Sequence, residues 1–429
     1  MPRPENMLRA LSGFALLAFS AYGYPLDGAA RTGIRRLTGC RLEHEGKIKG
    51  GQKLPPGALL AGDQIALRLK GLNDSFDIRT QSLRDPYLQA GVEKIFGGRD
   101  PSYAVALLDI TDSRRPLYAS LRPEEKMIPG SVGKLLVATG LFDALARLHP
   151  SSIAAREKIL RETVITADGF IFRDGKTVPI YQEGDPVVIH RRMELGDKFN
   201  LWEWVDHMLS QSSNSAGSVV WKQVLLLRQF GARYPVAREE EAAFFRATPK
   251  PELTKLALEA LETPLKAAGL DASRLRLGTF FTKNASAVIP GTASYACPNE
   301  LLRWPVKLEQ GKLVDAWSSL EIKKLLYFVR PRYRYAAAPA LNRAAVFFKS
   351  GSLFECRPEP GFTCGQYKGN QLNLMHSVAV VESGKKIYLV AIMSNVLKTN
   401  SAVEHETIAG EIEKWIQARP GTGTTDEHR

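Results

Sequence analysis

The sequence has few cysteines, a single long apolar run and no internal repeat. Four cysteines in 429 residues are too few for a disulfide scaffold, and a chain of this length can bury a large core without them. Hydrophobic residues make up 44% and charged residues 24%, a composition that excludes disordered and collagen-like chains. Because no apolar stretch after the N-terminal one approaches the length of a bilayer span, a polytopic membrane protein is excluded as well.

Acidic residues are outnumbered by basic ones. Lys and Arg total 58 against 45 Asp and Glu, which gives a formal net charge of +13. This balance favours an anionic polymer as partner, and nucleic acid and cell-wall polymer are the two candidates. The seven histidines lack the spacing of a metal site, so we expect no metal and no cofactor.

The N-terminal region is typical of a secretory signal peptide. Arg3 and Arg9 supply a positive segment, an apolar run covers residues 10–24, and small residues near its end form a cleavage pattern. We therefore expect residues 1–23 to be a signal peptide and the protein to be periplasmic or secreted. The alternative is an uncleaved anchor, which would be its one link to the membrane. Export argues against nucleic acid as the partner.

Export also permits disulfides among the four cysteines. Cys356 and Cys364 flank a loop rich in proline and glycine, and we expect them to pair. Cys40 and Cys297 could pair too, but four cysteines allow three connectivities and the sequence does not choose among them.

Strand patterns lie at both ends of the main part of the chain, with a helical block between them. Expected strands cover 103–110, 117–121, 345–348, 376–381 and 387–393, and a weaker alternating stretch covers 58–70. Expected helices cover 86–96, 131–148, 203–209, 216–230, 239–270 and 403–418. Because the first and last strands can pair under the last helix, the pattern predicts an α+β fold.

We divide the chain into four parts. After the signal peptide, residues 24–100 form an N-terminal extension whose role the sequence does not indicate. Residues 101–418 form the main domain. The stretch at 419–429, rich in glycine and threonine, is expected to be a disordered tail.

Three short motifs follow one another in a telling order. Ser131-Val132-Gly133-Lys134 opens an apolar helix, Ser212-Ser213-Asn214 lies in a polar break between helices, and Lys349-Ser350-Gly351 ends an apolar strand. Residues i and i+3 share a helix face, so Lys134 can reach the Ser131 hydroxyl. A serine hydroxyl needs such a base, and burial beside a second cation makes lysine one. Each motif alone suggests a cap, a turn or a strand end, but together they indicate an acyl-serine site.

The set resembles the penicillin-recognising serine hydrolases, which include D-alanyl-D-alanine peptidases and class A β-lactamases. The resemblance covers roughly residues 100–418 and includes Met127–Gly130 ahead of the nucleophile. It implies a β-lactamase/transpeptidase-like fold, in which an antiparallel sheet flanked by helices is joined to an all-helical subdomain. It also implies a monomer that acts on D-Ala-D-Ala-type peptidoglycan stem peptides and binds β-lactams.

The resemblance assigns roles residue by residue. Ser131 attacks the amide carbonyl, Lys134 takes the proton, and Ser212 relays it to the leaving nitrogen. The implied substrate-binding residues are Asn214, Lys349, Ser350, Gly351 and Ser352. Asn214 binds the amide of the substrate's side chain, and Lys349 with Ser350 holds its carboxylate. Lys349 also helps to lower the pKa of Lys134, and the N–H groups of Ser131 and Ser352 form the oxyanion hole.

Two departures from this family bear on the reaction. Class A β-lactamases carry a glutamate that activates the deacylating water, and its expected position falls near Thr282, in a stretch from Ala272 to Asn299 without Asp or Glu. A persistent penicilloyl-enzyme is therefore expected, which favours a peptidase. The alternatives are a β-lactamase with an atypical deacylation base and a non-catalytic cell-wall binding protein. Gly169–His190 is an expected insertion that could reshape the substrate cleft.

Two further patterns look like parts of binding sites. Gly130–Lys134 resembles a phosphate-binding loop, but Leu135 stands where Ser or Thr would bind magnesium. Arg330, Arg332 and Arg334 alternate with tyrosines. That alternation is typical of a solvated strand or loop, and a basic patch facing the substrate is the alternative.

Overall fold

The computed structural model describes residues 23–420, apart from residues 52, 74–75 and 173. The predicted signal peptide, except Gly23, and most of the predicted tail therefore lie outside the described residues. Arg419, the first residue of that tail, is held in place by ion pairs of 3.1 Å to Asp85 and 3.3 Å to Asp109. In the described part of the chain, no helix has the length and apolarity needed to cross a bilayer.

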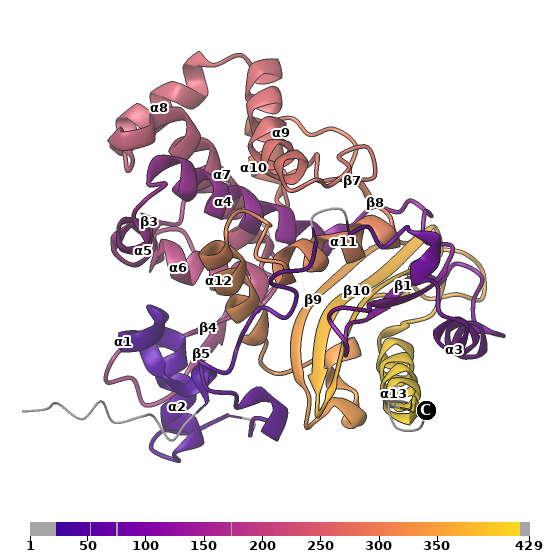
Figure 1. The fold of residues 1–429 in the computed structure, drawn as a ribbon. Coiled ribbons are helices and arrows are strands. Elements are labelled where there is room, and N and C mark those ends of the chain that lie inside the picture. The colour runs from indigo at the N-terminus through magenta and orange to yellow at the C-terminus, as the bar shows by residue number, and fades with distance from the viewer. Residues whose placement is uncertain (1–22, 52, 74–75, 173, 421–429) are drawn as a thin grey trace, which may run out of the picture.

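A five-stranded antiparallel sheet is the centre of one half of the molecule (Figure 1). In spatial order its strands are β2 (Leu117–Leu121), β1 (Ala104–Asp109), β11 (Lys386–Asn395), β10 (Leu372–Ser383) and β9 (Ala345–Glu355). The first and last strands of the chain pair, with Val105 opposite Ile392. All six residues of β1 are buried, because helices cover both faces of the sheet.

The helices on the two faces bury alternate residues of each strand. Val105 and Leu107 face α3 (Pro86–Phe96) and α13 (Ala402–Ala418), whereas Ala106 and Leu108 belong to the core on the other face. That second face is covered by α11 (Pro298–Glu309) and α12 (Ala316–Tyr327). The isoleucines of α13 recur every four residues, at 408, 412 and 416, which makes the face that it buries.

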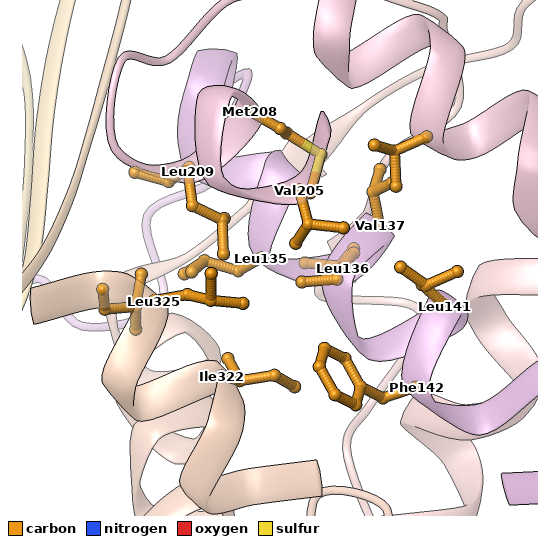
Figure 2. Packing of buried hydrophobic residues seen from close by; sticks show 14 of the residues in the cluster. Leu135, Leu136, Val137, Leu141, Phe142, Val205, Met208, Leu209, Ile322 and Leu325 are labelled. Atoms are coloured by element: carbon orange, nitrogen blue, oxygen red, sulfur yellow. The ribbon is translucent and has the colours of Figure 1, made fainter. Parts of the chain in front are cut away.

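The other half of the molecule is helical, with α4 at its centre. Its helices are α4 (Lys134–Leu148), α5 (Ile153–Glu162), α6 (Leu201–Leu209), α7 (Asn214–Phe230), α8 (Arg238–Ala247), α9 (Lys250–Ala267) and α10 (Lys283–Val288). Figure 2 shows α4 side chains such as Leu136 and Phe142 packed against Val205 of α6 and Ile322 of α12. Since α4 is buried from both sides, the residues at its N-terminus are held rigidly between the two halves.

Three pairs of short strands complete the structure. They are β3 (Val164–Thr166) with β6 (Lys198–Asn200), β4 (Val178–Ile180) with β5 (Ile189–Arg191), and β7 (Leu275–Arg276) with β8 (Tyr295–Ala296). The predicted insertion Gly169–His190 contains β4 and the start of β5, and it borders the cleft described below.

The N-terminal segment docks on the helical half. It forms α1 (Gly28–Thr32) and α2 (Arg35–His44), and Leu37 joins the main core. Arg36 is buried and donates to both carboxylate oxygens of Asp206, at 2.5 and 2.7 Å, and to the carbonyl of Phe328 at 3.1 Å. The division at residue 100 stays a prediction, but residues on both sides of it contribute to the same two cores.

Most predicted elements are present with small shifts at their ends, and one prediction is wrong. Residues 58–70 do not form a strand. Ile65, Leu67 and Leu69 are buried, so the alternation is real, but it belongs to an extended segment without a ladder partner. Two contacts of Arg68 hold that segment instead: its backbone N–H donates to Glu309 at 2.8 Å, and its guanidinium pairs with Glu382.

The predicted disulfide is present. Cys356 and Cys364 are joined, with their Cα atoms 5.9 Å apart, and close a loop between β9 and β10. The second pairing left open by the sequence is not formed, because Cys40 on α2 and Cys297 before α11 are separate, buried thiols.

Candidate active site

The three motifs meet where the N-terminus of α4 lies between the sheet and the helical half. Ser131 is in a short 3-10 turn, η4 (Gly130–Gly133), that leads into α4. Lys134 is fully buried, and its Nζ lies 2.9 Å from Ser131 Oγ. The spacing of three residues therefore places the amine beside the hydroxyl, as the sequence predicts.

Lys134 has neutral neighbours in place of a counter-ion. Its Nζ donates to the carbonyl of Ser212 at 2.8 Å and to Oδ1 of Asn214 at 2.7 Å, and it lies 4.5 Å from the ring centre of Phe281. Burial lowers the pKa of Lys134 to about 7; Asp174 opposes this shift and Lys176 adds to it. A large fraction of the amine is therefore neutral near pH 7 and can accept a proton.

Lys349 is the second buried lysine of the site. Its Nζ donates to Ser212 Oγ and to the carbonyl of Ser350, both at 2.8 Å. Burial and repulsion by Lys134 and other cations hold the pKa of Lys349 well below its usual range. The expected lowering of the pKa of Lys134 by Lys349 is not found, because burial and Lys176 account for that shift. The repulsion acts in the other direction: Lys134 lowers the pKa of Lys349.

Ser212 is held between these two lysines in a strained conformation. Its φ is +59°, in the left-handed region that a residue other than glycine adopts at a cost of about 1–3 kcal/mol. Lys134 binds its carbonyl and Lys349 its hydroxyl, so the two motifs on either side fix its position. Strain that is kept in this way is typical of functional sites.

The third motif lies on β9, directly against the nucleophile turn. A Cβ at Gly351 would lie 2.6 Å from the carbonyl oxygen of Pro129 and 3.2 Å from the nitrogen of Ser131, so no larger residue fits there. A Cβ at Gly130 would lie 3.2 Å from the nitrogen of Ser352. The nucleophile turn and β9 thus approach each other closely at Ser131 and Ser352, the two residues whose N–H groups the family resemblance assigns to the oxyanion hole.

A cleft of about 820 Å³ opens over this cluster. Ser131, Ser212, Asn214, Ser350 and Ser352 line it. Its walls carry several aromatic and aliphatic side chains, namely Leu277, Phe280, Phe281, Tyr333, Leu353, Phe354 and Tyr367. The cleft therefore combines a polar floor with apolar walls, the usual character of a small-ligand site.

Asp174 is a site residue that the sequence reasoning missed. Its Oδ2 accepts hydrogen bonds from Ser213 Oγ and from the backbone N–H of Ser215, both at 2.8 Å, one on each side of Asn214. In class A β-lactamases the second motif reads Ser-Asp-Asn, whereas here Ser213 occupies the middle position. The absence of an aspartate from Ser212-Ser213-Asn214 could have pointed to a carboxylate from another segment. The loop of residues 169–190 supplies it as Asp174.

Arg334 is the one member of the alternating arginine pattern that reaches the cleft. Its guanidinium donates to the hydroxyls of Ser350 and, at 3.1 Å, of Ser352, and it stacks 4.8 Å over the ring of Tyr367. Arg330 pairs with a glutamate and Arg332 binds backbone carbonyls, so neither is a solvated strand residue. Arg334 alone therefore faces the cleft, and the binding of a substrate by this arginine stays a prediction.

The expected position of the deacylation glutamate holds no acid. Thr282 is buried and donates to the carbonyl of Phe170 at 2.6 Å. Its neighbour Phe281 turns its ring toward Lys134, and the same ring lies 2.6 Å from a Cβ built at Gly217. An apolar ring thus lies beside the Lys134 amine, and Asp174 is the one carboxylate among the described residues that line the cleft.

Comparisons with known proteins define the fold. No protein-family model matches the chain, and no curated protein is similar to it in sequence. Among solved structures, an acyl-enzyme complex of a PBP-A mutant with penicillin G is similar at 12% identity and a TM-score of 0.50, covering 78% of this chain and 98% of that one. A β-lactamase from Sphaerobacter thermophilus is similar at 13% identity and a TM-score of 0.50, covering 77% and 94%.

These neighbours share the architecture described above, at identities too low to carry over an activity. The chain has the β-lactamase/transpeptidase-like fold of the penicillin-recognising serine hydrolases, as the three motifs implied. A second PBP-A structure is similar at 11% identity and a TM-score of 0.50.

Proposed function

We propose that this protein is an exported acyl-serine enzyme that cleaves D-Ala-D-Ala-type peptidoglycan peptides and is acylated by β-lactams on Ser131. The observation that carries the proposal is the 2.9 Å contact between Ser131 Oγ and the buried amine of Lys134. A nucleophile beside a base of matched pKa is what covalent catalysis by serine requires.

Acylation begins when neutral Lys134 accepts the proton of Ser131 as Oγ attacks the amide carbonyl carbon. The resulting oxyanion accepts hydrogen bonds from the N–H groups of Ser131 and Ser352, each worth about 3–4 kcal/mol in comparable enzymes. Ser212 gives its hydroxyl proton to the leaving nitrogen and receives the proton that Lys134 took. The carbon–nitrogen bond breaks, and the acyl group remains as an ester on Ser131.

The cations on the β9 side suit the carboxylate that ends such a peptide or is carried by a penicillin. Arg334 presents a guanidinium beside the hydroxyls of Ser350 and Ser352, and the amine of Lys349 lies behind them, where it donates to Ser212 and to the carbonyl of Ser350. Asn214 has its carbonyl oxygen occupied by Lys134, which leaves its amide nitrogen to donate to a carbonyl of the acyl group.

The acyl-enzyme should be long-lived with β-lactams. Phe281 occupies the space beside Lys134 where a water would need to be activated, and Asp174 already accepts bonds from Ser213 and Ser215. Slow hydrolysis of the ester favours a peptidase over a β-lactamase.

The test is intact-mass measurement of the purified protein with benzylpenicillin over time, with Ser131→Ala as the control. We expect the mass of one penicillin to be added and to persist, and we expect no addition to the variant. A brief adduct with accumulating penicilloic acid would indicate a β-lactamase with another deacylation base. Labelling that survives Ser131→Ala, or no labelling at all, would overturn the acyl-serine proposal.

The export and substrate parts of the proposal have separate tests. N-terminal sequencing of protein from the periplasm or medium should begin near residue 24. A peptide ending in D-Ala-D-Ala should release D-alanine with the intact enzyme and not with Ser131→Ala. Retention of the protein in the cytoplasm would overturn the proposed export. Absence of D-alanine release from a protein that penicillin does label would overturn the proposed substrate.

A further inference from the structure

Lys176 is a cation of the cleft that the proposed reaction does not use. It lies in the loop between η5 (Gly169–Ile171) and β4, is half-buried, and lines the cleft. Its Nζ donates to the hydroxyl of Tyr367 at 3.1 Å, and no ion pair joins it to a carboxylate among the residues that the structure describes. A half-buried ammonium whose partner is a neutral phenol can gain by exchanging it for an anion.

The acid nearest in sequence does not neutralise Lys176. One oxygen of Asp174 accepts the bonds from Ser213 and Ser215, and the other accepts the backbone N–H of Lys176 at 3.0 Å. Asp174 therefore ties the backbone of Lys176 to the start of α7 while its own oxygens are taken. The ammonium of Lys176 is left facing the cleft.

These bonds place the backbone of Lys176 beside Asn214. Asp174 binds the residues on both sides of Asn214, which under the proposed function binds the acyl part of the substrate. The carboxylate of the leaving group has its own cation, Arg334, beside the hydroxyls of Ser350 and Ser352. The ammonium of Lys176 reaches the hydroxyl of Tyr367, and Arg334 stacks on the ring of the same tyrosine, so Tyr367 separates the two cations.

We propose that Lys176 binds a carboxylate on the acyl-donor side, so that the enzyme selects acidic acyl donors over neutral ones. The inference rests on the proposed function and specifies the substrate class of the same cleft: a peptide with one carboxylate at its D-alanine end and another on the residue that precedes the D-Ala-D-Ala pair, within the part that becomes the acyl group. The phenol of Tyr367 holds the ammonium in position until that second carboxylate replaces it.

A matched pair of β-lactams tests this proposal. Carbenicillin is benzylpenicillin with a carboxylate on the side-chain carbon next to the amide, so the two share every other group. Second-order acylation rates of both are measured by intact mass on the full protein and on Lys176→Met and Lys176→Arg. Lys158→Met, which removes a lysine whose side chain is 71% exposed, is the control for net charge.

We expect carbenicillin to acylate the native protein about tenfold faster than benzylpenicillin, the size of one favourable charge–charge contact. The ratio should fall to about one in Lys176→Met and be kept in Lys176→Arg and Lys158→Met. Any effect of Lys176 on the base Lys134 alters both rates together and cancels in the ratio.

The two proposals fail in different ways. Acylation by benzylpenicillin with no preference for carbenicillin would overturn the acidic-donor inference and leave the acyl-serine function standing. Equal losses of acylation rate with both compounds in Lys176→Met would also overturn the acidic-donor inference, because they would show that Lys176 binds the carboxylate that both compounds share. Absence of any adduct would overturn the acyl-serine function and, with it, the inference.

Discussion

Two buried lysines, one beneath the cleft and one beside the sheet, differ in the charge of their partners. Lys323 on α12 is fully buried and lies 2.6 Å from Glu309 and 2.7 Å from Glu382, so its charge is compensated twice. Lys134 on α4 is equally buried, yet hydroxyl, carbonyl and amide oxygens are its partners. A buried cation that stabilises a fold is paired, whereas a cation that must give up its proton is left unpaired.

The same contrast holds elsewhere in the molecule. Lys222 on α7 lies 2.6 Å from Asp168 and 2.6 Å from Glu241, and Arg36 is paired with Asp206. Lys349, in the site, donates to Ser212 and Ser350 and has no ion pair with a glutamate or an aspartate in the described part of the chain. The partners of a buried cation therefore separate the lysines of the candidate site from the cations of the cores better than burial does.

Among the substitutions that test this comparison, Lys134→Met should have the largest effect on the acylation rate. Lys134→Met removes the proton acceptor and keeps the length of the side chain, so acylation by benzylpenicillin should fall about 10³-fold. Stability should be unchanged or higher, because an ammonium that burial disfavours is gone. Acylation rates and urea unfolding of the same preparation check both parts; a variant that acylates normally would show that Lys134 is not the base.

The same substitution at Lys323 should give the reverse pattern. Lys323→Met leaves Glu309 buried without its cation, whereas Glu382 keeps its ion pair with Arg68, and the unpaired Glu309 should cost about 3 kcal/mol of the free energy of unfolding. The folded fraction should still be acylated at the native rate, since this cluster does not contact the cleft. Urea unfolding measures the loss, and adding Glu309→Gln should recover part of it; a stable variant would contradict the comparison.

Asp174→Asn should give the smallest effect, a shift of the pH profile. Asp174 raises the pKa of Lys134, so removing its charge should move the rise of acylation with pH, centred near pH 7 in the native protein, to lower pH. Acylation should also slow, by about tenfold at most, because the bonds to Ser213 and Ser215 weaken. Rates from pH 5 to 9 check this, with Asp168→Asn as a control outside the cleft; an unmoved profile would assign Asp174 a purely structural role.

Local patterns predict what local physics decides. The apolar run of β1 and the four-residue repeat of isoleucines in α13 predict these elements from the sequence, because each pattern depends on the residues of a single element. The alternation at residues 58–70 misled for the same reason. Every second residue is buried in this segment, as it would be in a strand of a sheet. The sequence pattern is the same in both cases, but here an ion pair between Arg68 and Glu382 holds the segment.

The candidate site divides in the same way. Ser131 and Lys134 are three residues apart, so their contact follows from helix geometry alone. Asp174 lies 39 residues from Ser213, and Arg334 lies 16 residues from Ser350, distances over which no local pattern acts. Arg332 and Arg334 belong to one alternating run, yet Arg332 binds backbone carbonyls and Arg334 lines the cleft. This difference depends on what packs against each side chain.

The sequence by itself determined the α+β class, the three motifs and the contact between Ser131 and Lys134, because each is a matter of residue type and short spacing. Tertiary structure alone decided which cations would lie without counter-ions, where the carboxylate missing from the second motif would come from, and that Phe281 would face Lys134. The reason is physical: a charge in the interior takes its pKa from everything packed around it, and those neighbours come from segments far apart in the chain.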